Sequence, residues 1–435
     1  MERIVLPSKY QRRMLDHFIA YAMIDTQSDE ATLVSDYPTS GGQLVLADLL
    51  VSQLRKLGVS DARVSPFGYV YASLPENLPP DHPAKGRVPA IGLIAHLDTA
   101  GDQSGKGVRP QVHENYDGQD ISYPDDPELV LKASDNPELL ECRGMTVITA
   151  GGQTLLGADD KAGIAEIMAV VEYLTRKGVP HGEIRICFNP DEEVGGGMDH
   201  LDASKLPVRY AYTLDGGRVG EVEDECFNAA SARITILGRN CHPGSAKGKM
   251  ANAFRVFAWL TSRLPENELP ETTEGREPFR HPHSCPSTPT VERFQVDLLL
   301  RAFTEAELDR MKSVLQDLCR EAEGQFPGAR VTVEFKDSYR NMRRIIDEHP
   351  LVMELLEEAC RIQRVAVVHK PIRGGTDGSS LTIDRGIPTP NIWAGGMNMH
   401  SRLEWVPLEW MASAAATVLT LIGLWVEHGS ETGQA

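Results

Sequence analysis

The chain has 435 residues, 41% hydrophobic and 24% charged, a composition that excludes a disordered or fibrous protein and predicts two or three globular domains, two being the simpler expectation. Asp and Glu number 62 against 44 for Lys and Arg, and the net charge of -18 would repel nucleic acid and anionic membrane surfaces. Seven scattered cysteines without a C-x-x-C pair predict reduced thiols in a cytosol and exclude a structural zinc finger, so any metal would be held by histidines and carboxylates.

Neither a secretory signal nor a membrane span is expected. The charged residues in 1–13 are followed by no apolar run of the kind a signal peptide requires. The most apolar stretch, 412–426, is shorter than the roughly 20 residues that a bilayer demands, and it contains three hydroxyl side chains. We therefore interpret it as a core helix and expect a cytoplasmic protein with no membrane or nucleic-acid partner.

The first part of the chain alternates helical and strand patterns. Apolar residues recur at helical spacing in 43–57 and in 164–174, and the second helix is expected to end at Lys177-Gly178. Strands are predicted at 63–74, 89–95, 184–188 and 210–214. The last two runs are apolar without alternation, which is typical of strands buried on both faces of a parallel sheet. The predicted fold class is α/β, with a central, mostly parallel sheet and helices on both faces.

Between 227 and 338 the pattern changes. Strands are predicted at 232–237, 291–303 and 330–335, and helices at 249–264 and 304–323. This order suggests a ferredoxin-like β-α-β-β-α-β module, in which the Pro-rich stretch 265–289 is interpreted as a long surface loop. The α/β rhythm returns with a helix at 350–364, strands at 366–369 and 388–393, and a closing helix from Leu408. We therefore expect one domain formed by 1–226 and 339–435, interrupted by an inserted domain, 227–338.

His96 and Asp98 stand at the end of a predicted apolar strand. Side chains two apart in a strand point to the same side, so both would face one site. A metal-bound imidazole usually donates its other N–H to a carboxylate, and Asp98 is placed for that role. A purely structural histidine is the alternative, which this motif alone does not exclude.

Two acidic motifs follow predicted strands. Asp159 and Asp160 lie at a strand-to-helix turn, where α/β sheets bind ligands, although an acidic helix N-terminus would have the same composition. Asp191, Glu192 and Glu193 directly follow a buried strand and would repel one another unless a cation or a shared proton neutralises them. Because neighbouring side chains diverge, one glutamate can hold a metal while the other addresses water.

Two further residues complete the pattern. Asp215 ends the next apolar strand, and His400 lies in the glycine-rich loop 395–400. Each alone would be unremarkable. Together with the preceding motifs they place two histidines and several carboxylates at loop ends of one predicted sheet, which is the ligand set for a pair of divalent ions such as zinc.

These motifs resemble those of the peptidase T family, the tripeptide aminopeptidase branch of the di-zinc exopeptidases, nearly from end to end. The matching segments are Ile24-Asp25-Thr26-Gln27-Ser28, His96-Leu97-Asp98-Thr99-Ala100, Leu156-Gly157-Ala158-Asp159-Asp160-Lys161-Ala162-Gly163, Asp191-Glu192-Glu193-Val194-Gly195, Leu214-Asp215-Gly216-Gly217, His242-Pro243-Gly244, Pro371-Ile372-Arg373-Gly374-Gly375-Thr376-Asp377-Gly378 and His400. The resemblance implies a zinc-exopeptidase fold whose inserted domain is a lid, two Zn²⁺ per chain with Co²⁺ or Mn²⁺ as alternatives, and a short peptide as substrate. It leaves open a homodimer formed through the lid.

The resemblance also implies a role for each matching residue. The ligands would be His96 and Asp215 for one zinc, Glu193 and His400 for the other, and Asp159 as the bridge between them, followed by a cis peptide bond. Glu192 would be the general base that takes a proton from the attacking water, and Asp98 would orient His96.

Substrate recognition is implied by further positions. Asp215 favours the aminopeptidase side of the superfamily, because related carboxypeptidases and deacylases tend to have Glu there. His242, in the inserted domain, would hydrogen-bond the tetrahedral oxyanion when the lid closes, with a simple helix-start histidine as the alternative. Arg301 and Arg373 are candidates to grip the C-terminal carboxylate of the peptide, which would limit substrate length.

The chain departs from the family pattern in two places. Ala302-Phe303-Thr304 stands where an acidic residue is expected, and Ser401-Arg402-Leu403-Glu404 stands where a Gly-Lys-His-Glu type sequence is usual. The metal set survives both changes. They put the substrate preference in doubt, because both positions are expected near the path of the peptide.

We expect a cytoplasmic metalloaminopeptidase that acts on tripeptides. A di-zinc dipeptidase, or an amidase that acts on acylated amino acids, would share every ligand and is the alternative. A non-catalytic peptide-binding protein of the same fold is disfavoured, because Glu192 and all five proposed ligands are present.

Overall fold

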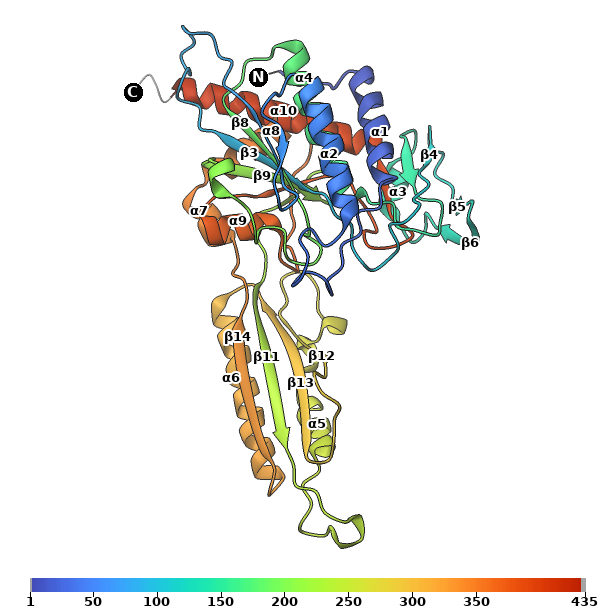
Figure 1. Cartoon of the computed structure of the whole chain (residues 1–435), viewed down its shortest axis with the longest axis vertical. Coiled ribbons are helices and arrows are strands. Elements are labelled where there is room, and N and C mark those ends of the chain that lie inside the picture. The colour runs from blue at the N-terminus through green and yellow to red at the C-terminus, as the bar shows by residue number, and fades with distance from the viewer. Residues whose placement is uncertain (1, 432–435) are drawn as a thin grey trace. The chain divides into compact units, whose positions relative to one another are not determined.

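The computed structural model describes residues 2–431, which form two compact units (Figure 1). The first unit comprises Met1–Asp224, Ile345–Lys370 and Thr376–Ala435, and the second comprises Glu225–Arg344 and Pro371–Gly375. The second unit is therefore an insertion made of two separate stretches of chain. The roles expected for the inserted domain, a lid and a dimer interface, stay predictions.

An eight-stranded sheet forms the centre of the first unit. Its strands follow the order β1 (Arg63–Val64), β2 (Val70–Leu74), β8 (Ile184–Asn189), β3 (Ile91–His96), β9 (Tyr210–Gly216), β16 (Asn391–Trp393), β10 (Glu221–Glu223) and β15 (Val368–His369). Strands β8, β3, β9 and β16 run parallel to one another, whereas β1 and β2 add antiparallel pairs at one edge. Every residue of β3 is buried, so both faces of the sheet are covered and the α/β prediction is confirmed.

Helices cover this sheet. They are α1 (Ser8–Ala22), α2 (Gly41–Lys56), α4 (Ala158–Lys177), α8 (Leu351–Gln363), α9 (Asp377–Arg385) and α10 (Leu408–Glu431), with the shorter α3 (Pro137–Glu141) and α7 (Arg343–Glu348) elsewhere in the chain. Helix α4 packs on β3 and β9 and also contacts α1 and α10. It begins after Gly157 and ends at Gly178, whose φ angles of 79° and 60° are open to glycine at no steric cost. The predicted end at Lys177-Gly178 is therefore confirmed.

Helix α10 includes the most apolar stretch of the sequence. Leu408–Ser430 has a mean hydropathy of 1.4, and its length and composition alone would allow it to cross a membrane. In this structure 83% of its apolar window is buried inside the protein, where α10 packs against α4 and α8. The burial agrees with the interpretation of 412–426 as a core helix.

Several short strands lie in segments where the sequence patterns predicted none. Strand β7 (Val147–Thr149) pairs with β4 (Gln111–His113) and β17 (Trp405–Pro407), and β5 (Ile121–Tyr123) pairs with β6 (Asp126–Leu131). Most of these strands have only three residues, too few to show a period.

The second unit is an antiparallel sheet with two helices. The elements follow one another as β11 (Asn228–Leu237), α5 (Ala253–Thr261), β12 (Phe279–Ser284), β13 (Arg293–Ala302), α6 (Glu305–Gln325) and β14 (Arg330–Asp337), and the strand order is β12-β13-β11-β14. This is the β-α-β-β-α-β order that the sequence suggested. The interpretation of 265–289 as a surface loop was wrong in one part, because β12 lies inside it and adds an edge strand to β13.

Candidate active site

The five predicted metal ligands come from the ends of different elements of the first unit. His96 is the last residue of β3, and Asp215 lies near the end of the neighbouring strand β9. Asp159 lies in the first turn of α4, where the Asp159–Asp160 peptide bond is cis, as the family resemblance implied. Glu193 follows β8, and His400 lies between β16 and β17.

The structure brings these five side chains together. His96 Nε2 lies 2.8 Å from Asp159 Oδ1 and 3.5 Å from Asp215 Oδ1. His400 Nε2 lies 3.3 Å from Asp159 Oδ2 and 3.0 Å from Glu193 Oε2. The two oxygens of Asp159 therefore face one histidine each, as a carboxylate shared between two metal positions would.

Asp98 supports the site from behind. Its Oδ1 lies 3.2 Å from Nδ1 of His96, which leaves Nε2 directed at the other carboxylates. Its two oxygens also accept the backbone N–H groups of Glu192, at 3.0 Å, and Glu193, at 3.1 Å. One buried carboxylate thus fixes both the histidine and the loop that carries the two glutamates.

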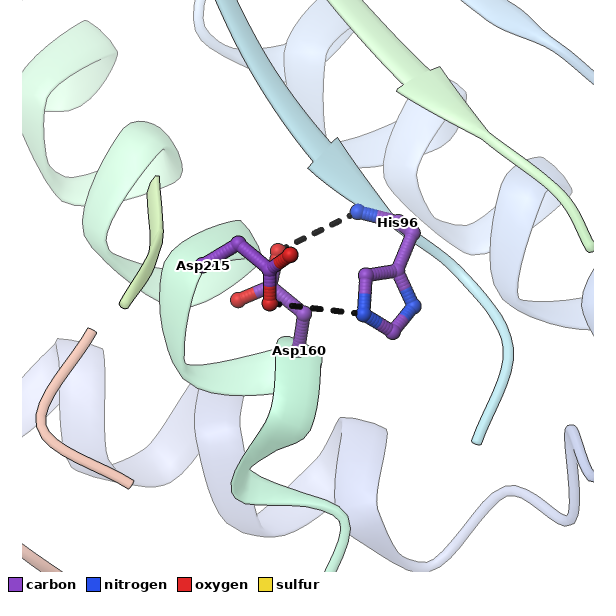
Figure 2. Close-up of side chains that lie close together, drawn as sticks. All are labelled: His96, Asp160 and Asp215. Carbon is purple, nitrogen blue, oxygen red and sulfur yellow. Dashed lines mark hydrogen bonds and ion pairs between the residues drawn. The ribbon is translucent and has the colours of Figure 1, made fainter. Parts of the chain in front are cut away.

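Asp160 is part of the same cluster, although no separate role was expected for it from the sequence. Figure 2 shows Asp160 and Asp215 directed toward His96. The Oδ2 atom of Asp160 accepts the backbone N–H of His96 at 3.2 Å, and its Oδ1 atom accepts the N–H of Gly163 at 3.2 Å. Ligand atoms of His96, Asp160 and Asp215 lie within 4.8 Å of one another, as do those of His96, Asp159 and Glu193.

Two other carboxylates hold the site in place and were missed by the sequence reasoning. Glu404 accepts the backbone N–H groups of Leu156 and Gly157, both at 2.7 Å, and of Asp159 at 3.1 Å. Asp377 accepts from Nδ2 of Asn189 at 2.5 Å. Both residues lie in motifs quoted in the sequence analysis, and this position was the only signal that they belong to the site.

The pKa values of the site reflect crowded, buried negative charge. Burial and the neighbouring Asp159 raise the pKa of Glu193 to about 7 and that of Asp215 to about 7. Burial, followed by the charge of Asp377, raises the pKa of Glu192 well above its ordinary value. Hydrogen bonds to Asp159 and Glu193 raise the pKa of His400 to about 11.

These residues fit a pair of divalent cations. Imidazole nitrogens and carboxylate oxygens are the donors that zinc and related ions take, and here they converge from two directions on Asp159. One carboxylate oxygen, Oε1 of Glu193, is buried without a hydrogen-bond partner among the described residues. The raised carboxyl pKa values point the same way, because added positive charge would relieve them.

The three remaining candidates belong to the second unit. His242 is exposed and its Nδ1 accepts the N–H of Gly244 at 3.2 Å, which is the helix-start role considered as the alternative. Arg373 donates to the carbonyls of Gly275 and Glu277, at 2.9 and 3.0 Å. Arg301 donates to its neighbouring carbonyl, Leu300, at 3.0 Å. Their roles toward a substrate stay predictions.

The two departures from the family pattern have local structural roles. Thr304 is the N-cap of α6, where its hydroxyl accepts the N–H of Glu307 at 3.2 Å. Arg402 pairs with Asp126 at 2.9 Å and donates to the carbonyl of Gly152 at 3.1 Å. Their effect on substrate preference stays open to experiment.

Comparison with known proteins identifies the family of the chain. The model of the peptidase family M20/M25/M40 matches residues 156–423. Proteins named peptidase T include one from Clostridium perfringens, 43% identical over 96% of this chain and 100% of its own length, and one from Brevibacillus brevis, 44% identical over 95% and 99%. The crystal structure of the aminopeptidase PepT from Bacillus cereus is 21% identical, with a TM-score of 0.74 over 96% of this chain and 99% of its own.

A more distant structure shares the fold. It is a dinuclear metal-binding peptidase of the M20 family from Bacillus subtilis, 12% identical, with a TM-score of 0.64 over 97% of this chain and 99% of its own. The resemblance to peptidase T that the sequence indicated is confirmed by relatives that match over almost the whole chain. The chain belongs to the peptidase family M20/M25/M40.

Proposed function

We propose that the protein is a metalloaminopeptidase that removes the N-terminal residue of tripeptides. The observation that carries the proposal is the position of Asp159 between His96 and His400, with Asp215 and Glu193 on either side. Relatives named peptidase T at more than 40% identity support the substrate class.

In this proposal His96 and Asp215 hold one zinc ion, Glu193 and His400 hold the other, and Asp159 contributes to both. Bound there, two ions would polarise the scissile carbonyl and lower the pKa of the attacking water. The mixed imidazole and carboxylate donors would also accept Co²⁺ or Mn²⁺.

Glu192 is the proposed general base. Glu192 is not one of the five proposed metal ligands. Its backbone N–H donates to Oδ1 of Asp98 at 3.0 Å. Its carboxylate would take the proton of the attacking water and pass it to the leaving amine, and burial favours the protonated form between these two transfers. Asp98 acts as a positioning residue, because it contacts His96 and the glutamate loop.

The remaining roles belong to the same proposal. His242 would donate to the tetrahedral oxyanion, and Arg301 and Arg373 would bind the C-terminal carboxylate of the peptide. We place the enzyme in the cytoplasm, because its seven cysteines form no disulfide among the described residues. We also propose that two chains associate through the second unit as a homodimer.

A peptide series tests the function. The zinc-loaded protein should cleave the first peptide bond of an unblocked tripeptide faster than that of the matched di- and tetrapeptide, and should not cleave the N-acetylated tripeptide. Faster cleavage of the dipeptide would indicate a dipeptidase. Preference for the acetylated peptide would indicate the amidase alternative and end the aminopeptidase proposal.

A further inference from the structure

A cavity of about 820 Å³ lies beside the glutamate loop of the first unit. Its walls come from 25–30, 39–42 and 101–102, together with Glu193 and Val194. The volume is in the range of ligand sites in proteins. Segment 25–30 includes part of the Ile24-Asp25-Thr26-Gln27-Ser28 motif, to which the proposed mechanism gives no role.

One wall is fixed to the strand end that carries His96. Thr99 donates its N–H to the carbonyl of Thr26 at 3.3 Å, and Ser28 donates its N–H to the carbonyl of Thr99 at 3.1 Å. The buried Lys161 donates to the carbonyl of Ile24 at 2.8 Å. The segment that contains Asp25 is therefore tied to both β3 and α4.

A second wall is fixed to the glutamate loop. The buried carboxylate of Asp191 accepts the backbone N–H of Thr39 at 2.8 Å, its hydroxyl at 2.5 Å, and Nε2 of Gln43 at 2.7 Å. Gln43 accepts the N–H of Asp191 in return, at 3.0 Å. Because Asp191 directly precedes the two glutamates, the cavity is preorganised relative to the metal ligands.

The lining of the cavity is strongly acidic. It contains the carboxylates of Asp25, Asp29, Glu30, Asp102 and Glu193, and no Lys or Arg. Asp102 is paired with Nδ1 of His400 at 3.2 Å, whereas Asp29 and Glu30 are exposed and have no ion pair among the described residues. Glu193 also lines the cavity, its side chain is only 7% exposed, and its Oε1 has no hydrogen-bond partner within 2–431.

We propose that this cavity binds the N-terminal residue of the peptide and selects a cationic side chain, lysine or arginine, at that position. The inference rests on the proposed function, because Glu193 is both a proposed metal ligand and part of the cavity wall. The residue to be released must lie next to the metals, and the only charges that a long side chain would meet in the cavity are carboxylates.

The test compares Lys-Gly-Gly with norleucyl-Gly-Gly, which has nearly the same shape without the charge, and with Glu-Gly-Gly. We expect kcat/KM to fall in that order, by about tenfold from the first to the second at low salt, since each exposed ion pair contributes only a few-fold. Raising the salt to about 0.5 M should remove most of this difference, because such charges are screened.

The double variant Asp29→Asn/Glu30→Gln should bring the ratio between the lysyl and norleucyl peptides close to one while the norleucyl peptide keeps its kcat. Asp48→Asn/Asp81→Asn, which removes two exposed carboxylates outside the cavity lining, serves as the matched control and should leave the ratio unchanged. Equal kcat/KM for the two peptides, or a ratio that the double variant does not change, would overturn the proposal.

Failure of the cavity proposal and failure of the proposed function can be told apart. If the tripeptides are cleaved without charge preference, the function stands and the cavity proposal is overturned. If no tripeptide is cleaved by the zinc-loaded protein, the function fails, and calorimetric binding of lysinamide against norleucinamide then tests the cavity by itself. Equal Kd values in that measurement would overturn it.

Discussion

Each unit of the molecule buries charged side chains, but the two clusters are balanced differently. In the second unit, the fully buried Arg280 pairs with Glu268, whose other oxygen accepts from Arg310 at 2.6 Å. In the first unit, carboxylates outnumber the two histidines, and the pKa values of Glu193 and Asp215 are raised to about 7.

The comparison separates a structural cluster from a functional one. A buried charge is costly unless it is paired, and the second unit supplies the pairing from its own chain. The first unit leaves carboxylates in excess over histidines around Asp159, and added cations would balance this charge without the need to protonate Glu193 and Asp215. The missing compensation marks the site where we expect metal ions and catalysis.

The largest expected effect is on turnover. Replacing the proposed base, Glu192→Gln, should lower kcat by about 10² to 10⁴-fold, the usual contribution of a general base. Zinc content, measured by elemental analysis, should stay at the wild-type value, whereas Glu193→Gln should lose zinc. Equal zinc loss in both variants would show that Glu192 has been assigned the wrong role.

The structural cluster should respond in stability alone. Arg280→Met leaves the carboxylate of Glu268 partly uncompensated and should lower the free energy of unfolding, measured in urea, by about 3 to 5 kcal/mol. Zinc content and kcat per folded molecule should not change, and adding Glu268→Leu should recover part of the loss. A large fall in kcat with unchanged stability would contradict the comparison.

A smaller effect is expected for Asp98, the proposed positioning residue. Asp98→Asn keeps the shape of the side chain but offers only one acceptor oxygen to the two backbone N–H groups of Glu192 and Glu193. Zinc affinity, measured by competition with a chelator, should fall by about 10 to 100-fold. An unchanged affinity would mean that His96 is oriented without Asp98.

The smallest effect is the pH dependence of the metal-free protein. Because the folded-state pKa values of Glu193 and Asp215 are raised to about 7, these groups favour folding while protonated, and that contribution is lost as pH rises through about 7. The Tm of chelator-treated protein should therefore fall as the pH rises from about 4.5, where these groups already ionise in the unfolded chain, to about 7, where they ionise in the folded protein. The Tm of zinc-loaded protein should fall less over the same range. An equal fall in both forms would count against the idea that bound metal compensates the charge of these carboxylates.

Much of the first unit could be predicted from sequence. Strands β8 and β9 are largely apolar and almost entirely buried. Their carboxyl ends meet at one edge of a parallel sheet, so the residues near those ends were expected to converge. In the structure, Nε2 of His96 lies within 3.5 Å of a carboxylate oxygen of Asp159 and of one of Asp215. The supporting contacts were not predictable, because Glu404 lies 245 residues from Asp159 in the chain.

The second unit was predicted less completely. Strand β12 lies in a segment rich in Pro, Glu, Thr and His, which local signals favour as a loop. Its pairing with β13 comes from tertiary context, since residues such as Phe279 pair across the strands with Arg301. The burial of Arg280 in the same strand depends on Glu268, a partner that no periodicity reveals.

The position of α10 after α4 and α8 in the chain has a consequence for synthesis on the ribosome. Helices α4 and α8 are made earlier, and α10 packs against both of them. Until α10 has left the exit tunnel, apolar surface on those helices stays uncovered and exposed to other chains. Premature termination before Leu408 should therefore yield a polypeptide that aggregates or occupies chaperones, even though it contains all the proposed catalytic residues and metal ligands.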